Sequence, residues 1–565
     1  MAADILSQIV EGRKADIKKR GLDFDYEIPQ ERKRRVHPFI QEKGVVLEVK
    51  RASPSKGDIA PKLNASETAL AYQEAGASAI SVLTEENYFK GNLGDLISVC
   101  QSVDVAVLRK DFLVFPDEID IAYKCGADAV LLIARILDQE TLAKMLCRCA
   151  SFGITAFVEL RLEEDLQKLA AAKSLAAGEL PAIVCGVNSR DLKDFSIDLL
   201  KPLGFLERIK SVMGSDCSVI FESGIRTAQA AAFAGSLGFT GLLLGEAAAR
   251  DTSKAASFVK AFVSGTETPN ALAWKKIAAK TESDCKAKNP AALLGERKYR
   301  PLVKICGLAN VEDALAAADL GADFLGFVFC EASPRNASES VVRSVRAALR
   351  DKNMSQADNA APRDKPASEA SRKSARNNDC SFAFDATSGP FMVGVVVDTT
   401  SEQAKAALAL VKEGVLDYIQ LHGERAAKEF FADKENASLP HYCAANLNGA
   451  NVVSDENCAG GLDKIQGLLN LGEPRVLIDA KVGDKVGGTG TQVAEDLVFE
   501  AKKKSPLWLA GGLGAENVRD VIEKYSPELI DASSLLEAAP GKKDLEKLKA
   551  FFSEVGAAYA GGAQF

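Results

Sequence analysis

The stretch DAVLLI (128–133), ARILDQETLAKMLCRCASFG (134–153), ITAFVEL (154–160) sets two short apolar runs on either side of a segment long enough for a helix. The two runs consist mainly of aliphatic and β-branched residues, as do strands that are buried on both faces. The polar and apolar residues of the middle segment alternate in the manner of a helix that connects two parallel strands. This stretch therefore predicts one strand–helix–strand unit of a parallel sheet.

The same unit recurs on both sides of this stretch throughout the first half of the chain. The further strand candidates are VVLEVK (45–50), AISVL (79–83), VAVLRK (105–110), AIVCGV (182–187), SVIFES (218–223) and GLLLG (241–245). Eight strand–helix units within about 200 residues predict a closed (β/α)8 barrel. Before the barrel, Ile5, Leu6, Ile9, Val10 and Ile17 have helical spacing and predict an N-terminal helical extension.

A second set of eight strand candidates follows after a break. Residues 263–300 are mostly polar, contain no strand candidate and are interpreted as a linker. The pattern then restarts with LVKIC (302–306), DFLGFVF (323–329), FMVGVVV (391–397), LDYIQLH (416–422), HYCAA (441–445), RVLIDA (475–480), LWLAGG (507–512) and LIDASS (529–534). The predicted fold is therefore α/β, with two consecutive (β/α)8 barrels over residues 1–262 and 301–565.

The second barrel is predicted to carry an insertion. Residues 351–388 are rich in Ser, Ala, Asn, Asp, Lys and Arg and have few large apolar side chains. Such a segment buries too little apolar surface to offset the entropy lost on ordering. We expect a disordered or loosely held insertion near the helix that follows the second strand of this barrel.

The composition excludes several classes of protein. The 565 residues are 47% hydrophobic and 26% charged, an ordinary globular balance, and the net charge of −8 does not favour nucleic-acid binding. The twelve cysteines form no C-x-x-C pair, there is no N-terminal apolar signal, and no apolar run approaches the roughly 20 residues that span a bilayer. We expect a cytoplasmic protein with reduced thiols, with no metal, membrane or obligate protein partner.

Polar residues cluster where the strands of the first barrel end. They are Glu48, Lys50, Lys110, Glu159, Asn188, Arg190, Glu222 and Ser223. The carboxyl ends of all strands of such a barrel meet at one mouth, where a lysine beside carboxylates can act as an acid and a carboxyl with a raised pKa can act as a base. A structural ion-pair network is the alternative reading. Ser53 in SPSKG, Gly224 and Gly245 offer hydroxyl and amide donors that suit a phosphate.

Five motifs, in order, give the first half a close resemblance to indole-glycerol-phosphate synthase: LEVKRASPSKG, LTEENYFKGN, LRKDF, GVNSRDL and FESGI. The resemblance implies ring closure of carboxyphenylamino-deoxyribulose phosphate with loss of carbon dioxide and water. It implies that Lys110 is the general acid at the carbonyl and Glu159 the general base that aids loss of the hydroxyl. Glu48 would work beside Lys50, which contacts the substrate carboxylate or acts as a further acid. The remaining implied site residues are Asn188, Arg190, Glu222 and Ser223, with Ser53, Gly224 and Gly245 holding the phosphate.

The second half has its own set of candidate residues at strand ends. Cys306 ends the first strand of this half, Arg335 follows the second, His422 ends the fourth and Asp479 ends the sixth. A single cysteine is more often an inert core residue than a catalytic one. The glycine-rich loops GGTG (487–490) and AGGL (510–513) can approach phosphate, although turns also use glycine.

Taken together, VKICGL, GFVF with SPR, QLHG, VLIDAK with GGTG, AGGL and IDASS resemble phosphoribosylanthranilate isomerase. The resemblance implies an Amadori rearrangement in which Asp479 protonates the ring oxygen and Cys306 removes the proton from carbon 2. It implies that Arg335 pairs with the anthranilate carboxylate and that His422 lines the site. Its phosphate-site candidates are Gly488, Gly490, Gly512 and Ser533.

The whole chain thus resembles the bifunctional enzymes of tryptophan biosynthesis. Such a chain takes small phosphorylated anthranilate–sugar substrates and requires no cofactor, because every proton transfer has a side-chain candidate. One alternative is a double barrel that processes other phosphosugars, which would not need both Lys110 with Glu159 and Cys306 with Asp479. Another is a chain with one barrel retained as a non-catalytic scaffold, which predicts the loss of an acid or base, and neither half lacks one.

Overall fold

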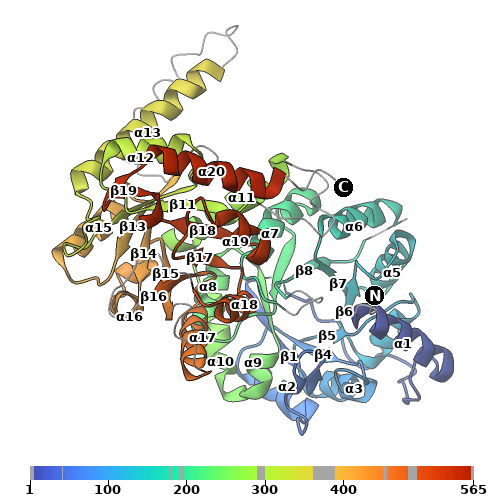
Figure 1. The fold of residues 1–565 in the computed structure, drawn as a ribbon. Helices are drawn as coiled ribbons and strands as arrows, with labels where there is room; N and C mark the ends of the chain where they lie inside the picture. Colours follow the sequence, from blue (N-terminus) through green and yellow to red (C-terminus); the bar gives the residue numbers. More distant parts are fainter. Residues whose placement is uncertain are drawn as a thin grey trace, which may run out of the picture. The chain divides into compact units, whose positions relative to one another are not determined.

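The computed structural model describes residues 5–40, 42–176, 178, 180–190, 196–288, 300–360, 389–448, 455–481 and 493–560. The chain forms two compact units, one built mainly from residues 1–278 and the other mainly from residues 279–565. Each unit contains a closed barrel of eight parallel strands with helices around it (Figure 1). The prediction of two consecutive (β/α)8 barrels is therefore confirmed.

The first barrel closes when its first strand pairs with both its second and its last strand. In chain order the strands are β1 (Gly44–Val49), β4 (Ala79–Leu83), β5 (Ala106–Lys110), β6 (Ala129–Ile133), β7 (Thr155–Leu160), β8 (Ile183–Asn188), β9 (Ser218–Glu222) and β10 (Gly241–Leu244). The short hairpin of β2 (Ala52–Ser53) and β3 (Gly57–Asp58) follows β1. The helices are α1 (Ile5–Arg20), α2 (Ala65–Glu74), α3 (Leu93–Ser102), α4 (Glu118–Cys125), α5 (Gln139–Phe152), α6 (Glu163–Leu175), α7 (Lys201–Met213), α8 (Ala228–Ser236), α9 (Glu246–Arg250) and α10 (Ala255–Ser264).

The two-residue period of a strand explains how the interior of this barrel has a charged layer of side chains directly above an apolar layer. Side chains two positions apart on a strand share one face. Within the barrel, one layer is a buried apolar cluster that includes Val46, Leu108, Phe157 and Ile220. Two residues further along the same four strands stand Glu48, Lys110, Glu159 and Glu222. The interior therefore changes from apolar to charged at the carboxyl ends of the strands.

The second barrel closes in the same way, through pairing of β11 with β12 and β18. Its strands are β11 (Leu302–Cys306), β12 (Phe324–Val328), β13 (Phe391–Val396), β14 (Tyr418–His422), β15 (His441–Asn448), β16 (Val476–Lys481), β17 (Trp508–Ala510) and β18 (Leu529–Ala532). A hairpin of β19 (Glu537–Ala539) and β20 (Lys542–Lys543) follows. The helices are α12 (Val311–Asp319), α13 (Glu339–Ala360), α15 (Glu402–Lys412), α16 (Glu424–Ala432), α17 (Asp455–Asn470), α18 (Glu495–Lys502), α19 (Val518–Tyr525) and α20 (Leu545–Ala560).

Two segments differ in detail from their sequence-based interpretation. The stretch interpreted as a linker, 263–300, contains the helix α11 (Pro269–Lys288), in which Trp274 is fully buried. The backbone of α13 remains helical through Ala360, within the predicted insertion 351–388. Residues 361–388 lie outside the described residues. Among the described helices, none is both long and apolar enough to cross a membrane.

Candidate active sites

The mouth of the first barrel contains a cavity of about 400 Å³. Most of the predicted site residues of this half line it, namely Glu48, Lys50, Ser53, Lys110, Glu159, Asn188, Arg190, Ser223, Gly224 and Gly245. Apolar side chains of α1 (Ile5, Leu6 and Ile9), together with Phe89 and Phe112, form further parts of the wall. The cavity thus has a charged floor and apolar sides, which suits a ligand with one aromatic and one polar end.

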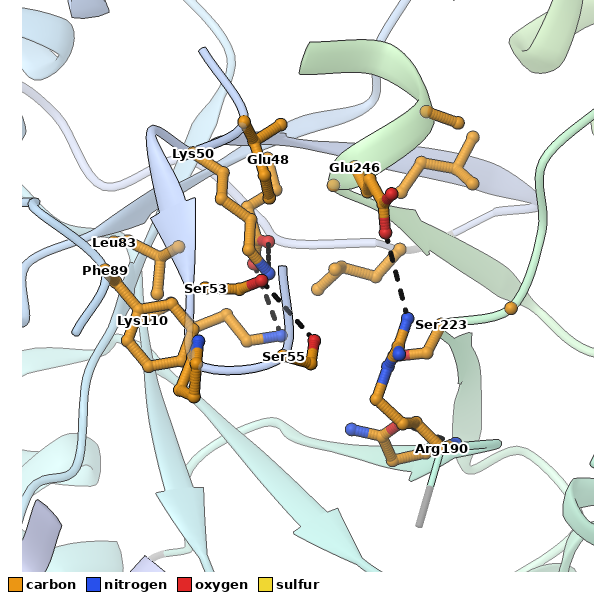
Figure 2. Close-up of a pocket in the computed structure, with 18 of the residues that line it drawn as sticks. Glu48, Lys50, Ser53, Ser55, Leu83, Phe89, Lys110, Arg190, Ser223 and Glu246 are labelled. Carbon is orange, nitrogen blue, oxygen red and sulfur yellow. Dashed lines mark hydrogen bonds and ion pairs between the residues drawn. The ribbon is translucent and has the colours of Figure 1, made fainter. Parts of the chain in front are cut away.

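Lys110 lies among the three carboxylates of the barrel interior. Its Nζ is 2.9 Å from Glu222 Oε2 and 3.5 Å from Glu48 Oε2. Glu48 Oε1 is in turn 3.3 Å from Lys50 Nζ, so Glu48 contacts both lysines (Figure 2). Glu222 is almost fully buried and forms part of the floor under Lys110. These contacts join residues from β1, β5 and β9 that are far apart in the sequence.

The electrostatic surroundings give the carboxyl groups different protonation behaviour. Burial opposes ionisation of Glu48, but Lys50 and Lys110 outweigh it and hold the pKa of Glu48 below its ordinary value. Burial and the neighbouring Glu222 raise the pKa of Glu159 to about 7. The three carboxylates raise the pKa of Lys110 above its ordinary value in spite of its burial. The site therefore combines an ammonium that is protonated near neutral pH, and so has a proton to donate, with a carboxyl that can exchange a proton in that range.

The side of the cavity opposite Lys110 carries Arg190, and it also carries Ser223 and Glu246, the sequence neighbours of the predicted phosphate donors Gly224 and Gly245 (Figure 2). Ser223 and Gly224 both have positive φ (70° and 83°), a conformation that turns the chain sharply after β9. A methyl group built on Gly245 would lie 2.4 Å from Glu48 Oε1, so a side chain at this position would collide with the Glu48 carboxylate. Arg190 Nη2 lies 4.0 Å from Glu246 Oε2, so the carboxylate that follows Gly245 shares this side of the cavity with Arg190 (Figure 2).

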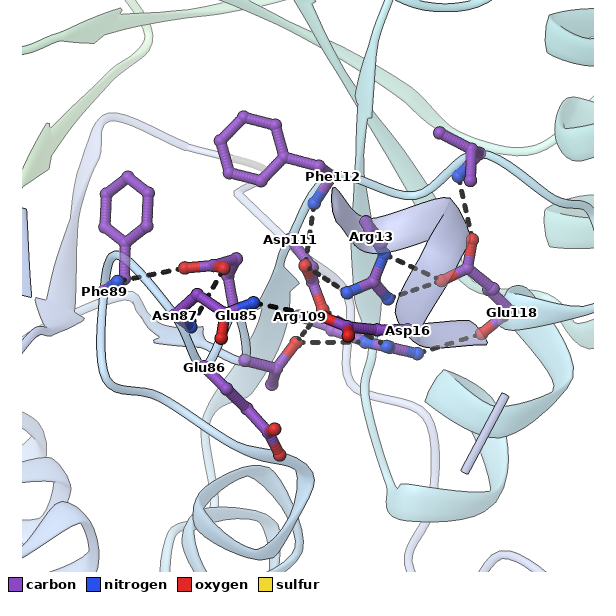
Figure 3. A network of polar contacts seen from close by, with 12 residues as sticks. Arg13, Asp16, Glu85, Glu86, Asn87, Phe89, Arg109, Asp111, Phe112 and Glu118 are labelled. Carbon is purple, nitrogen blue, oxygen red and sulfur yellow. Dashed lines mark hydrogen bonds and ion pairs between the residues drawn. The ribbon is translucent and has the colours of Figure 1, made fainter. Parts of the chain in front are cut away.

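A second polar network fixes α1 behind the cavity wall, and sequence reasoning did not find it. The Arg13 guanidinium is 95% buried, and its Nη1 is 2.8 Å from Asp111 Oδ1 while its other nitrogens contact Glu118 (Figure 3). Asp111 also accepts hydrogen bonds from the Phe112 amide and from Arg109. Because Asp111 follows Lys110 directly, Arg13 connects α1 to the strand that carries Lys110.

The second barrel has a smaller cavity of about 150 Å³ at the corresponding end of its strands. Of the predicted residues, Cys306, Arg335, His422, Asp479, Gly512 and Ser533 line it. Gly488 and Gly490 lie outside the described residues. His422 Nε2 is 3.9 Å from Asp479 Oδ2, and the Ser533 hydroxyl donates a hydrogen bond to the carbonyl of Cys306. The structure therefore brings together all the predicted residues of this half that it describes.

The pKa values of Cys306 and Asp479, the two candidate proton-transfer groups of this cavity, both differ from their ordinary values. Burial raises the pKa of the Cys306 thiol, although the nearby Lys304 opposes the shift. Burial also raises the pKa of Asp479 to about 6, against a hydrogen bond from the Ala480 amide. Burial and the positive charge of Lys304 lower the pKa of His422 to about 4, so His422 is neutral at physiological pH.

Sequence reasoning missed a set of buried polar residues at this cavity: Gln420 and Asp531, which line it, and Lys304 and Tyr442, which contact them. Lys304 contacts Asp531 and Gln420, and Gln420 in turn accepts a hydrogen bond from the Tyr442 hydroxyl. A sequence signal for them exists, because Lys304 and Gln420 interrupt apolar strands two residues before Cys306 and His422. That spacing puts each of them on the same strand face as the site residue.

Arg335 forms an ion pair with Glu537. Its Nε and Nη2 hold both carboxylate oxygens of Glu537, at 2.9 and 2.8 Å for the two shortest contacts, and Lys543 Nζ lies 3.0 Å from Glu537 Oε1. The two cations hold the pKa of Glu537 below its ordinary value in spite of burial. A ligand carboxylate would therefore meet an arginine that is already oriented by Glu537.

Comparison with known proteins gives matches in both halves. The family model "Indole-3-glycerol phosphate synthase" matches residues 6–262, and the model "N-(5'phosphoribosyl)anthranilate (PRA) isomerase" matches residues 348–554. The second match begins after β12, so Cys306 and Arg335 precede it.

Three relatives show how the similarity is distributed. The tryptophan biosynthesis protein TRP1 of Phytophthora nicotianae is 31% identical over 510 residues, 87% of this chain and 88% of that protein. The multifunctional tryptophan biosynthesis protein of Schizosaccharomyces pombe is 31% identical over 536 residues. The match covers 90% of this chain and 59% of that protein. The indole-3-glycerol phosphate synthase of Mycolicibacterium smegmatis is 41% identical over 254 residues, 43% of this chain and 89% of its own length.

The fold and the two cavities define a class of protein with two (β/α)8 barrels, each with acid–base residues at the mouth. Within that class, the chain belongs to the family of tryptophan biosynthesis proteins in which an indole-3-glycerol phosphate synthase domain precedes a phosphoribosylanthranilate isomerase domain. The chain spans less than two thirds of the length of the multifunctional relatives from Schizosaccharomyces pombe and Phanerodontia chrysosporium.

Proposed function

We propose that this chain catalyses two successive steps of tryptophan biosynthesis. The second barrel would isomerise N-(5-phosphoribosyl)anthranilate to carboxyphenylamino-deoxyribulose phosphate, and the first would convert that product to indole-3-glycerol phosphate. The observation that carries the proposal is that each cavity contains one acid–base pair, Lys110 with Glu159 in the first and Cys306 with Asp479 in the second. The family membership of both halves supports the same assignment.

In the isomerase step, Asp479 would act first. A carboxyl with a pKa of about 6 keeps part of its protons near neutral pH and can protonate the furanose ring oxygen. Opening of the ring leaves an iminium ion, whose carbon 2 proton Cys306 would remove as thiolate. The resulting enol-amine becomes the aminoketose when it tautomerises. Arg335, oriented by Glu537, would hold the anthranilate carboxylate.

In the synthase step, Lys110 would donate a proton to the substrate carbonyl while the anthranilate ring carbon attacks it. Loss of carbon dioxide restores the benzene ring. The hydroxyl then leaves as water with a proton from Lys50, the candidate further acid, and Glu159 removes the ring proton whose loss completes the indole. A base with a pKa of about 7 is well matched to this task near neutral pH. Glu48 would hold Lys50 and Lys110 in position, with Glu222 under Lys110 and Asn188 lining the cavity with Glu159.

Recognition of the phosphate groups would rest on the glycine-rich turns. In the first barrel, Ser53, Ser223, Gly224, Gly245 and Arg190 all line the cavity, and their hydroxyl, amide and guanidinium groups are the candidate donors. In the second barrel the corresponding donors are Gly512 and Ser533, with Gly488 and Gly490 as sequence-based candidates. We also propose a cytoplasmic location, since all nine cysteines whose side chains the structure describes are free thiols.

The proposed function is tested with the purified chain and phosphoribosylanthranilate. Anthranilate derivatives change their fluorescence at each step, so both conversions can be followed in one cuvette. The parental chain should form indole-3-glycerol phosphate, whereas Lys110→Ala should accumulate the aminoketose and form the indole about 10²–10⁴-fold more slowly, the range expected for loss of a general acid. Failure of the parental chain to consume phosphoribosylanthranilate, or full synthase activity of Lys110→Ala, would refute the assignment.

A further inference from the structure

Lys304 is a charged residue in the interior of the second barrel with no exposed surface. It lies on β11 within LVKIC, and its ammonium contacts Asp531 on β18 and lies 2.6 Å from Gln420 Oε1 on β14. A buried ammonium is costly unless its donors are paired. Residues from three strands, β11, β14 and β18, therefore combine to hold one cation at this position.

The position of Lys304 relative to Cys306 suggests what the cation does. The two residues are two apart on β11 and so face the same side of the strand. A methyl group built on Gly326, their neighbour on β12, would lie 2.8 Å from Cys306 Sγ and 3.0 Å from Lys304 Cε. The two side chains therefore converge on the same glycine, which places the ammonium-bearing end of Lys304 on the side of the thiol.

Other charged and titratable groups also face the thiol. Asp531 on β18 contributes a negative charge that disfavours the thiolate, and Lys543 on β20 contributes a positive charge that favours it. Arg335 and the Tyr442 hydroxyl, which come from the loop after β12 and from β15, interact with Cys306 at longer range. Among these groups Lys304 has the strongest influence in favour of the thiolate, and it is the cation on the same strand face as Cys306.

The proposed isomerase reaction makes a specific demand on this cavity. It requires Asp479 with its proton and Cys306 without one, although the pKa of Asp479 is about 6 and that of an ordinary thiol is about 8.5. For two such groups the required combination is the minor one, present in fewer than about one molecule in 300. Each unit by which a neighbouring cation lowers the thiol pKa increases this fraction about tenfold.

We propose that Lys304 is a positioning residue for the isomerase base: its buried ammonium, held in place by Asp531 and Gln420, stabilises the thiolate of Cys306. This inference rests on the proposed function of the second barrel and adds a residue that acts through Cys306 and does not touch the reacting atoms. The competing interpretation is that Lys304 and Asp531 form a structural ion pair with no influence on the thiol. The two interpretations predict different titrations of Cys306.

The test measures the pH dependence of Cys306 alkylation by iodoacetamide in the full chain, with peptide mass spectrometry to separate it from the other thiols. Lys304→Met keeps the length of the side chain and removes the charge. It should move the midpoint for Cys306 upward by about one to three pH units, the range typical of one close opposite charge. Cys330 lines the same cavity and serves as an internal reference, whose alkylation profile should not move.

A second variant removes the opposing charge. Asp531→Asn should move the Cys306 midpoint downward, because Asp531 disfavours the thiolate. This opposite direction cannot arise from general loosening of the barrel, and it decides the question if Lys304→Met does not fold. An unchanged Cys306 midpoint in folded Lys304→Met, or an unchanged or raised midpoint in Asp531→Asn, would overturn the proposal.

The alkylation result does not depend on isomerase activity, so the inference and the proposed function can fail separately. If the parental chain isomerises phosphoribosylanthranilate and the midpoints do not move, only the role of Lys304 is wrong. If the midpoints move as expected but the parental chain does not isomerise, the thiol is tuned and the proposed function is wrong. When both hold, the isomerase pH–rate profile of Lys304→Met should shift upward in parallel with alkylation.

Discussion

At the scale of single residues, the isomerase reaction proposed for the second barrel requires Asp479 to carry a proton while Cys306 carries none, which is the less stable of the two protonation arrangements. Burial raises the pKa of both Cys306 and Asp479, which favours the protonated acid but opposes the ionised base. The carboxyl is thus well suited to its proposed task, whereas the thiol depends on its neighbours. This difference makes Cys306 the more informative residue to change.

We predict that Cys306→Ala slows isomerisation at least about a hundredfold, the lower limit for loss of a general base. The variant should still fold, because only one sulfur atom is removed from a half-buried position. Asp479→Asn should give a similar loss, since an amide cannot protonate the ring oxygen. The measurement is the rate of phosphoribosylanthranilate consumption, with synthase activity on preformed aminoketose as the control. Isomerisation by Cys306→Ala at the parental rate would show that another group removes the proton.

The first barrel allows a prediction about pH. Glu159 must be ionised to act as a base, and its pKa is raised to about 7 by burial and by Glu222. Synthase kcat/KM should therefore fall as the pH drops through about 7 and level off above it. The phosphate of the substrate also titrates, near pH 6, and could change kcat/KM in a similar pH range. Glu159→Gln is therefore the control, because its pH profile should lose the change near pH 7 and keep the change caused by the phosphate. A profile in the parental chain without a limb near pH 7 would contradict the assignment of Glu159.

At the scale of elements, α1 forms part of the wall of the first cavity although it lies outside the barrel strands. Its apolar residues Ile5, Leu6 and Ile9 line the cavity, while Arg13 on the same helix forms ion pairs with Asp111 and Glu118. The helical spacing of the apolar residues was visible in the sequence. The anchoring by Arg13 was not, because its two partners are about a hundred residues further along the chain.

We predict that Arg13→Met detaches α1 from the strand end that carries Lys110. Removal of one partner from a buried ion pair costs about 3–5 kcal/mol, enough to release a terminal helix from the barrel. The KM of the synthase reaction should rise by about tenfold, equivalent to about 1.4 kcal/mol of binding free energy. Hydrogen exchange of residues 5–20 should become faster, while isomerase activity stays unchanged. Arg13→Lys is the matched control and should retain part of the anchoring; slow exchange of α1 in Arg13→Met would contradict this role.

At the scale of the whole molecule, each barrel closes on itself and holds its own polar groups. No described residue of the first cavity takes part in the second, since the two sets of lining residues do not overlap. The two proposed reactions therefore have separate machinery within one chain. A substitution in one cavity should leave the chemistry of the other intact.

This separation can be tested by mixing two inactive variants. Lys110→Ala should isomerise but not cyclise, and Cys306→Ala should cyclise but not isomerise. An equimolar mixture should form indole-3-glycerol phosphate from phosphoribosylanthranilate, because the intermediate can diffuse from one protein molecule to the other. The measurement is indole formation in the mixture against each variant alone. No recovery in the mixture, with each single activity intact, would show that the second reaction requires the intermediate from its own chain.

The sequence by itself determined the two barrels and a set of site residues that, Glu222 apart, line the two cavities wherever the structure describes them. Strand identity is a local property, set by apolar runs such as DAVLLI (128–133) and their spacing, and all sixteen predicted strands occur within a few residues of their predicted bounds. Residues such as Glu48, Lys110 and Glu159 were found because they stand at strand ends, where a parallel barrel gathers its side chains. Their roles stay predictions, carried by resemblance and geometry.

Only the tertiary structure decided which groups contact each other and how they change each other's pKa values. Lys304 and Asp531 are 227 residues apart in the chain, and they meet because β11 pairs with β18 when the barrel closes. The pairing of Arg335 with Glu537 and the anchoring of α1 by Arg13 depend on closure and docking in the same way. Burial and distance control electrostatic interactions, and both are properties of the packed barrel that no local pattern of residues contains.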